Sequence, residues 1–222
     1  MPSEILSQVL PLGTSRNPFN YEKVEEIGRD ISTQWLTLDE IAQQINLYED
    51  ESQDGYLQSL DLAVRQAIED YLGMSIYPIT YKVYYGASGM VASPVSLDLP
   101  EVSQNFNQNQ PGITIQSVGF WNDSNVFTLF DKADYYYDNS GNKIILGSVP
   151  SNISTYRTAP IEVKYQTAAN PLANYPVIKQ AGLLLFTHLY NNRSNTVESS
   201  MGLKNIPFGF DTLLRKYKDL VM

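Results

Sequence analysis

The sequence predicts an α+β fold, in which helices from both halves of the chain form a core and an antiparallel sheet is inserted between them. Three observations support this prediction. Apolar residues recur at three- and four-residue steps before residue 76 and again after residue 171, which is typical of helices. The middle holds short segments rich in β-branched and aromatic residues, separated by turn residues. Hydrophobic residues make up 43% of 222, enough for a sizeable core.

The chain divides into four predicted parts. An N-terminal arm spans residues 1–36, because its segment EKVEEIGRDIS is too polar and short to form a stable helix alone. The first half of the helical core spans 37–75, the β-rich insertion spans 76–170, and 171–222 supplies the second half and a terminal helix. We expect the arm to be extended, either frayed or held by a neighbouring molecule.

Two helices are predicted in the first half of the core. The first begins with a capping box, in which Thr37 is the N-cap and Glu40 lies three residues later, and it runs to about Leu47. The second runs from about Gln53 to Leu72 and ends at Gly73, where a left-handed cap is expected. Its predicted buried stripe consists of Leu57, Leu60, Val64, Ala67, Ile68 and Tyr71.

The inserted region is predicted to form five or six antiparallel strands in a small sheet or sandwich. A polar loop spans residues 103–112, and the DNSGN sequence at 138–142 predicts a hairpin turn. The candidate strand segments are TYKVYYGA, VSLDL, ITIQSVGFW, VFTLF, DYYYD, KIILG and IEVKYQT.

The last part of the chain is predicted to be helical again. Pro176 suits the first turn of a helix, where its missing N–H is not needed. The run VIKQAGLLLFTHLYNNR that follows is apolar almost all round, so we expect this helix at the centre of the core. After a loop at 194–207, a short terminal helix carries Phe210, Leu213, Leu214 and Tyr217.

The composition limits the chemistry that is expected. The absence of cysteine excludes disulfides, thiolate metal sites and cysteine nucleophiles. No secretory signal precedes the fold, and the longest apolar run, at 181–189, is too short to span a bilayer, so no membrane partner is expected.

The net charge of −9 is unevenly distributed. Residues 1–75 hold 14 acidic and 4 basic residues, residues 76–175 hold 7 and 5, and residues 176–222 hold 3 and 6. This distribution argues against tight wrapping around nucleic acid, which requires clustered Lys and Arg. It suits head-to-tail contacts between an acidic and a basic face, or a lumen that repels DNA; a solvated acidic surface without a partner is the alternative.

No residue cluster predicts catalysis, a metal or a cofactor. The single histidine, His188, has no serine or carboxylate beside it on its helix, which favours a core or interface role over that of a general base. Asp131, Asp134 and Asp138 lack calcium-loop spacing, so turn and strand-end roles are favoured over a carboxylate pair. The phosphate-binding, dinucleotide and nucleophile-elbow glycine motifs are absent. We therefore expect a protein that is not an enzyme.

Tyrosine is abundant in the predicted sheet. Tyr81, Tyr84, Tyr135 and Tyr137 alternate with their neighbours, as side chains of a half-buried sheet do. The 16 tyrosines and 2 tryptophans also allow a platform on which sugar rings stack. Packing is the favoured interpretation.

Three stretches together resemble the head–tail connector family of tailed bacteriophages. The first is TLDEIAQQINL followed by YLQSLDLAVRQAIEDYLGMSI, and the second is SVGFWNDSNVFTLFDKADYYYDNSGNKIIL. The third and most specific is PVIKQAGLLLFTHLYNNR with IPFGFDTLLRKYK. The resemblance covers residues 37–222. It does not extend to the arm at 1–36, and the loop at 103–112 lacks the proline pair expected before ITIQSV.

The resemblance implies a structural adaptor in the neck of the virion, made in the host cytoplasm. Such a chain forms a dodecameric ring that joins the portal protein to a tail-side protein and leaves a channel through which genomic DNA passes. Cyclic symmetry then requires heterologous contacts between copies. The residues expected at the portal or at the inter-subunit interface are Pro207, Phe208, Phe210, Leu213, Leu214, Arg215, Lys216, Tyr217 and Lys218.

Alternatives remain open at this point. Another virion protein, such as a tail completion or baseplate subunit, fits the same organisation. A carbohydrate-binding or glycan-cleaving module would use the aromatic sheet, with Trp121 and Tyr136 as stacking residues. A DNA-binding protein fits the charge distribution least well.

Overall fold

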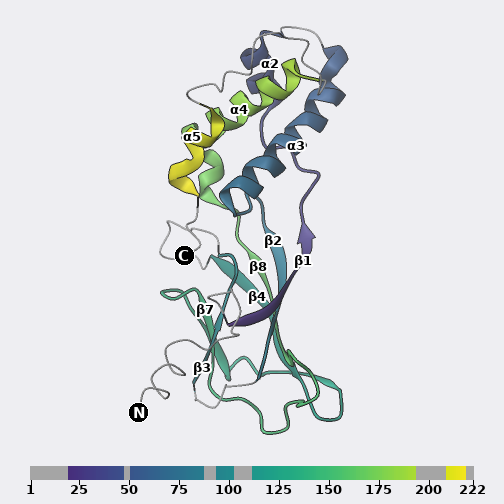
Figure 1. Ribbon diagram of the computed structural model, residues 1–222, viewed down its shortest axis with the longest axis vertical. Helices are drawn as coiled ribbons and strands as arrows, with labels where there is room; N and C mark the ends of the chain where they lie inside the picture. Colours follow the sequence, from purple (N-terminus) through teal and green to yellow (C-terminus); the bar gives the residue numbers. More distant parts are fainter. Residues whose placement is uncertain (1–19, 48–50, 88–93, 103–111, 194–208, 219–222) are drawn as a thin grey trace, which may run out of the picture.

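The chain folds into a helical lobe and a β lobe, joined end to end in an elongated molecule (Figure 1). This computed structural model describes residues 20–47, 51–87, 94–102, 112–193 and 209–218. The α+β class and the helical core built from both halves of the chain are confirmed. Within the described residues, none of the helices is long and apolar enough to cross a membrane.

The helical lobe contains four described α-helices around one core. The predicted capping box is present: Thr37 Oγ1 accepts the Glu40 N–H, and Glu40 accepts the Thr37 N–H at 2.9 Å. Gly73 adopts the left-handed conformation at φ 73° and ends α3, as predicted. The elements are α2 (Leu38–Ile45), η1 (Glu51–Gln53), α3 (Asp54–Leu72), η2 (Pro171–Asn174), α4 (Pro176–Asn191), α5 (Phe210–Leu214) and η3 (Arg215–Tyr217).

Helix α4 is central because it packs against α2, α3 and α5. It buries one face, on which Ile178, Ala181 and Phe186 are fully enclosed. Its opposite face is less covered than the apolar sequence predicts, and Val177 is 39% exposed. The central position is confirmed, but enclosure on all sides is not.

The β lobe is a sandwich of two antiparallel sheets. The five-stranded sheet has the order β1-β2-β8-β4-β5, and the three-stranded sheet has the order β3-β7-β6. Residues of both sheets share one hydrophobic core. All seven candidate segments form strands, more than the five or six strands predicted, and the predicted hairpin joins β6 to β7. The bounds are β1 (Tyr21–Arg29), β2 (Ile79–Tyr85), β3 (Val95–Asp98), β4 (Ile113–Trp121), β5 (Phe127–Leu129), β6 (Tyr135–Asp138), β7 (Lys143–Leu146) and β8 (Ile161–Thr167).

The predicted arm at 1–36 requires a correction. Its first 19 residues lie outside the described part of the chain, but residues 21–29 form β1, the edge strand that pairs with β2. Register shifts interrupt this pairing twice, and every residue of β1 is half-buried or exposed. A charged, irregular edge strand lacks the apolar alternation that identifies a strand in sequence.

The segment after β1 also belongs to the fold. Trp35 and Leu36 are buried in the helical core, so the ordered structure begins well before Thr37. From β1 in the β lobe, the chain thus crosses to the helical lobe, and it crosses twice more, after α3 and after β8. The β region is inserted in the helical core, and the first strand is contributed from outside that insertion.

A close contact between Trp35 and α4 gives the first testable prediction. A Cβ added at Gly182 would lie 2.6 Å from the Trp35 ring, so the substitution Gly182→Ala forces the ring to move. We expect a loss of about 1–2 kcal/mol in the free energy of unfolding, since overpacking outweighs the helix propensity of alanine. Urea denaturation measures this loss. The control Gly55→Ala, also in a helix but with nothing within 4 Å, should leave stability unchanged or raise it.

Candidate interaction surfaces

The predicted docking helix packs on its own core. Leu214 is fully buried in the helical lobe. The Phe210 ring meets Tyr71 edge-on at 5.8 Å between centroids, and Tyr217 meets Tyr175 in the same way at 5.8 Å. Much of the apolar stripe expected to face a partner is therefore used inside the molecule.

The polar side of the same segment faces solvent. Arg215, Lys216 and Lys218 are exposed, and none has a carboxylate within ion-pair distance in the described part of the chain. The Lys218 ammonium lies 5.0 Å from the Tyr71 ring centroid. Pro207 and Phe208, the other predicted contact residues, lie outside the described residues. The exposed part of this candidate interface is thus basic.

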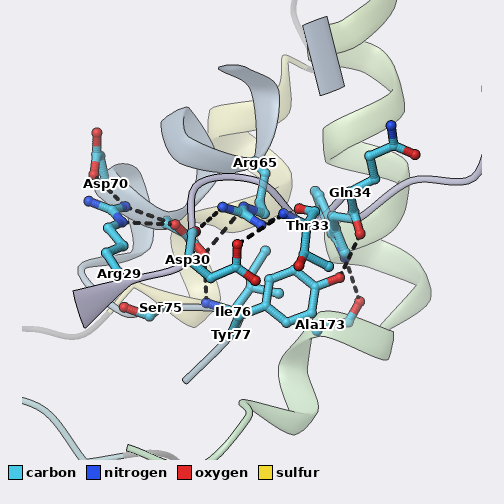
Figure 2. Close-up of polar contacts among 12 residues, drawn as sticks. Arg29, Asp30, Thr33, Gln34, Arg65, Asp70, Ser75, Ile76, Tyr77 and Ala173 are labelled. Carbon is cyan, nitrogen blue, oxygen red and sulfur yellow. Dashed lines mark hydrogen bonds and ion pairs between the residues drawn. The ribbon is translucent and has the colours of Figure 1, made fainter. Parts of the chain in front are cut away.

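A buried row of charges on α3 holds the segment that enters the helical lobe. Asp61 accepts the backbone N–H groups of Trp35 and Leu36 at 2.8 and 3.1 Å. One turn later, Arg65 donates to the carbonyl oxygens of Asp30 and Thr33 (Figure 2). Because these bonds reach backbone groups, they fix the path of residues 30–36 largely independently of its side chains.

The next turn of α3 joins this row to the β lobe. Glu69 is 3% exposed and accepts the Arg29 guanidinium at 2.8 Å and the Ile76 N–H at 3.0 Å. Arg29, the last residue of β1, also contacts the Asp70 carboxylate at 3.0 Å (Figure 2). The Tyr77 hydroxyl donates to the Gln34 carbonyl at 2.7 Å, which ties the chain leaving α3 to the chain entering α2. Charged and polar contacts thus hold two of the crossings between lobes together.

A half-buried carboxylate, that of Glu101, completes the junction from the side of β3. It accepts the Ser75 N–H at 2.7 Å and the Tyr81 hydroxyl, while its carbonyl accepts the Tyr165 hydroxyl at 2.8 Å. Burial raises the pKa of the Glu101 carboxyl, and burial likewise raises that of Asp61 against the opposing effect of its N–H donors. When the pKa of a carboxyl group is higher in the folded protein than in the unfolded chain, the stability of the fold declines as the pH rises from the unfolded-state pKa to the folded-state pKa.

The other residues considered from the sequence have structural surroundings. His188 is exposed on α4, so the expectation of a core histidine is wrong; an interface role stays a prediction. The turn roles of the aspartates are confirmed: Asp138 accepts the Ser140 N–H and hydroxyl at 2.9 and 2.6 Å, and the Asp134 N–H donates to the Asp131 carbonyl. These bonds to Ser140 lower the pKa of Asp138.

The aromatic residues of the β lobe serve mainly in packing, as favoured from the sequence. Tyr81 is buried and Tyr135 and Tyr137 pack against the same core. Trp121 is covered by the Arg157 guanidinium at 3.8 Å from its ring centroid and belongs to the five-stranded sheet, whereas Tyr136 belongs to the other sheet. Within the described residues, no group of three His, Asp or Glu side chains is placed to hold a metal ion.

Comparison with known proteins finds likeness in structure alone. No protein-family model matches the sequence, and no curated protein matches it significantly. The fold matches a chain from the neck of an empty gene transfer agent particle, determined with C6 symmetry, at a TM-score of 0.58 and 16% identity. It also matches chains from the native gene transfer agent virion, at 0.60 and 16%, and from the neck of the native particle with C12 symmetry, at 0.58 and 17%. Each match covers 90% of this chain and 97% of the other. The chain therefore shares the fold of these proteins over nearly its whole length.

The buried row on α3 gives the second prediction. The substitution Asp61→Ala leaves the N–H groups of Trp35 and Leu36 without an acceptor and removes a charge near buried Arg65. We expect a loss of about 2–4 kcal/mol in the free energy of unfolding. The matched variant Asp61→Asn keeps one acceptor oxygen and should lose less than half as much in chemical denaturation. Equal losses in both variants would mean that the two backbone bonds are not what Asp61 contributes.

Proposed function

We propose that this chain is a structural subunit of the neck of a phage-like particle. The observation that carries the proposal is the match of its fold, over 90% of the chain, to chains of gene transfer agent necks. The resemblance of residues 37–222 to head–tail connectors of tailed bacteriophages, drawn from sequence motifs, points to the same class. Its place would be the virion neck.

The finer proposal is a portal adaptor that forms a dodecameric ring. The neck of the native gene transfer agent particle was determined with C12 symmetry, which supports a twelve-fold arrangement for chains of this fold. A ring of this kind would join the portal protein to a tail-side protein and leave a channel for DNA. The net charge of −9 suits a channel whose wall does not bind the passing duplex. No catalytic step belongs to this role.

The position of the terminal helix changes which of the predicted interface residues are available to a partner. Leu214 is buried in its own subunit, so it contributes to the fold and is unavailable to a partner. We propose that the contact with the portal or with a neighbouring subunit uses the exposed residues Arg215, Lys216 and Lys218 and the half-buried edges of Phe210, Leu213 and Tyr217. Pro207 and Phe208 stay in the proposal on the sequence alone.

Electron microscopy of the purified chain, with and without its portal protein, tests this function. We expect twelve-fold rings that stack coaxially on the portal ring. A chain that stays monomeric under both conditions would contradict the proposal. Rings that bind tail proteins but never the portal would indicate a tail completion or baseplate subunit instead. A deletion of residues 207–222 is unsuitable as a test because it removes Leu214 from the core; surface substitutions avoid this problem.

A further inference from the structure

An acidic pocket opens where β1 meets the end of α3. It has a volume of about 250 Å³ and is lined by four carboxylates, those of Glu26, Glu69, Asp70 and Glu101, with the guanidinium of Arg29. Arg29 is engaged by Glu69 and Asp70 at 2.8 and 3.0 Å, while Glu26 lies 3.9 Å from it. The side chains of Glu26 and Asp70 are 50% and 59% exposed. Arg65 also lies 3.8 Å from Glu69, so two guanidiniums face four carboxylates and negative charge stays in excess at the pocket.

An apolar side chain flanks this pocket. Ile31, just after β1, is 68% exposed. It lines a second pocket of about 200 Å³, with Leu62 and Ala63 among the other lining residues, and this pocket shares Arg29 and Glu69 with the first. An exposed isoleucine beside a charged pocket is typical of the surface that a protein partner covers.

The complementary charges of this chain lie on the turn that ends its described C-terminal part. Arg215, Lys216 and Lys218 are exposed there and lack ion-pair partners in the described residues. Three adjacent unpaired cations repel one another and gain from a negative neighbour. A second copy of the chain offers such a neighbour at its acidic pocket.

The two surfaces lie on opposite sides of the same end of α3. Glu69 faces Arg29 of β1, whereas Tyr71, two residues later, contacts Phe210 and Lys218. Two residues correspond to about 200° around a helix, so these side chains project in nearly opposite directions. Figure 1 shows the same arrangement, with α5 on one side of α3 and β1 on the other. A ring built from heterologous contacts requires two complementary faces placed in this way.

We infer that the acidic pocket at β1 receives the basic turn at 215–218 of the adjacent subunit, so that these two surfaces form the head-to-tail contact of the ring. The inference rests on the proposed function, because it assumes the ring and identifies the two surfaces through which adjacent subunits bind. It assigns Arg215, Lys216 and Lys218 to contacts between copies rather than to the portal. Ile31 supplies an apolar part of the same contact.

Cysteine cross-linking tests the contact directly, because the natural chain has no cysteine. The double variant Glu26→Cys/Lys216→Cys, oxidised after assembly, should give a ladder of disulfide-linked multimers on a denaturing gel. Each single variant should stop at the dimer. The matched control Glu26→Cys/Lys132→Cys moves the second cysteine to an exposed site in the β lobe and should give no ladder. Rings visible by electron microscopy without a ladder above this control would overturn the inference.

Charge reversal supplies an independent readout on exposed residues. Asp70→Lys and Lys216→Glu should each lower the ring fraction about tenfold or more, because each places like charges together, and the two combined should restore it. Lys132→Glu should leave ring assembly unchanged. Unchanged assembly in both single variants, with unchanged thermal unfolding, would overturn the contact while leaving the ring itself intact. A wild-type chain that forms no ring, alone or with portal, would instead overturn the proposed function and the contact with it.

Discussion

The row of charged side chains on α3 is the constraint on which the rest of the structure depends. Asp61, Arg65 and Glu69 follow one another at four-residue steps on one face of the helix, and each is at most 3% exposed. A buried charge costs several kcal/mol unless it is paired and hydrogen-bonded. Here the partners are the backbone of residues 30–36, the N–H of Ile76 and the guanidinium of Arg29. The helix can therefore bury this face only when both neighbouring crossings are in place.

This arrangement couples the two lobes. Each lobe has its own hydrophobic core. With nonpolar packing alone, the relative orientation of the lobes would be set only by the three segments that cross between them. Directional bonds from Glu69, Glu101 and Tyr77 fix that orientation, because hydrogen bonds and ion pairs depend on angle as well as distance. A subunit whose lobes keep one orientation presents a constant pair of faces. Closed rings require this, since a small error in each contact accumulates around the ring.

The sequence predicted the elements with regular apolar patterns and missed those defined by charge. The capping box at Thr37, the left-handed Gly73 and the seven strand segments follow from local rules that need no tertiary information. Strand β1 and the buried face of α3 do not: acidic and basic residues are read as solvent-exposed, and only the folded structure supplies their partners. The sequence holds one signal for this buried face: Asp61, Arg65 and Glu69 continue the apolar stripe of α3, which indicates that their side chains are buried as well. Ala67, placed in that stripe from its spacing, is exposed instead.

Amide hydrogen exchange at Trp35 and Leu36 in the isolated chain tests the central claim most directly. Both N–H groups lie in a segment outside regular helix and strand, where only the Asp61 carboxylate accepts them among the hydrogen bonds described. If the charged row of α3 holds the segment that connects the two lobes, these amides should exchange as slowly as the core of α3, through global unfolding. Exchange at the rate of exposed loop amides, with α3 still protected, would show that the connecting segment opens on its own and would contradict the account.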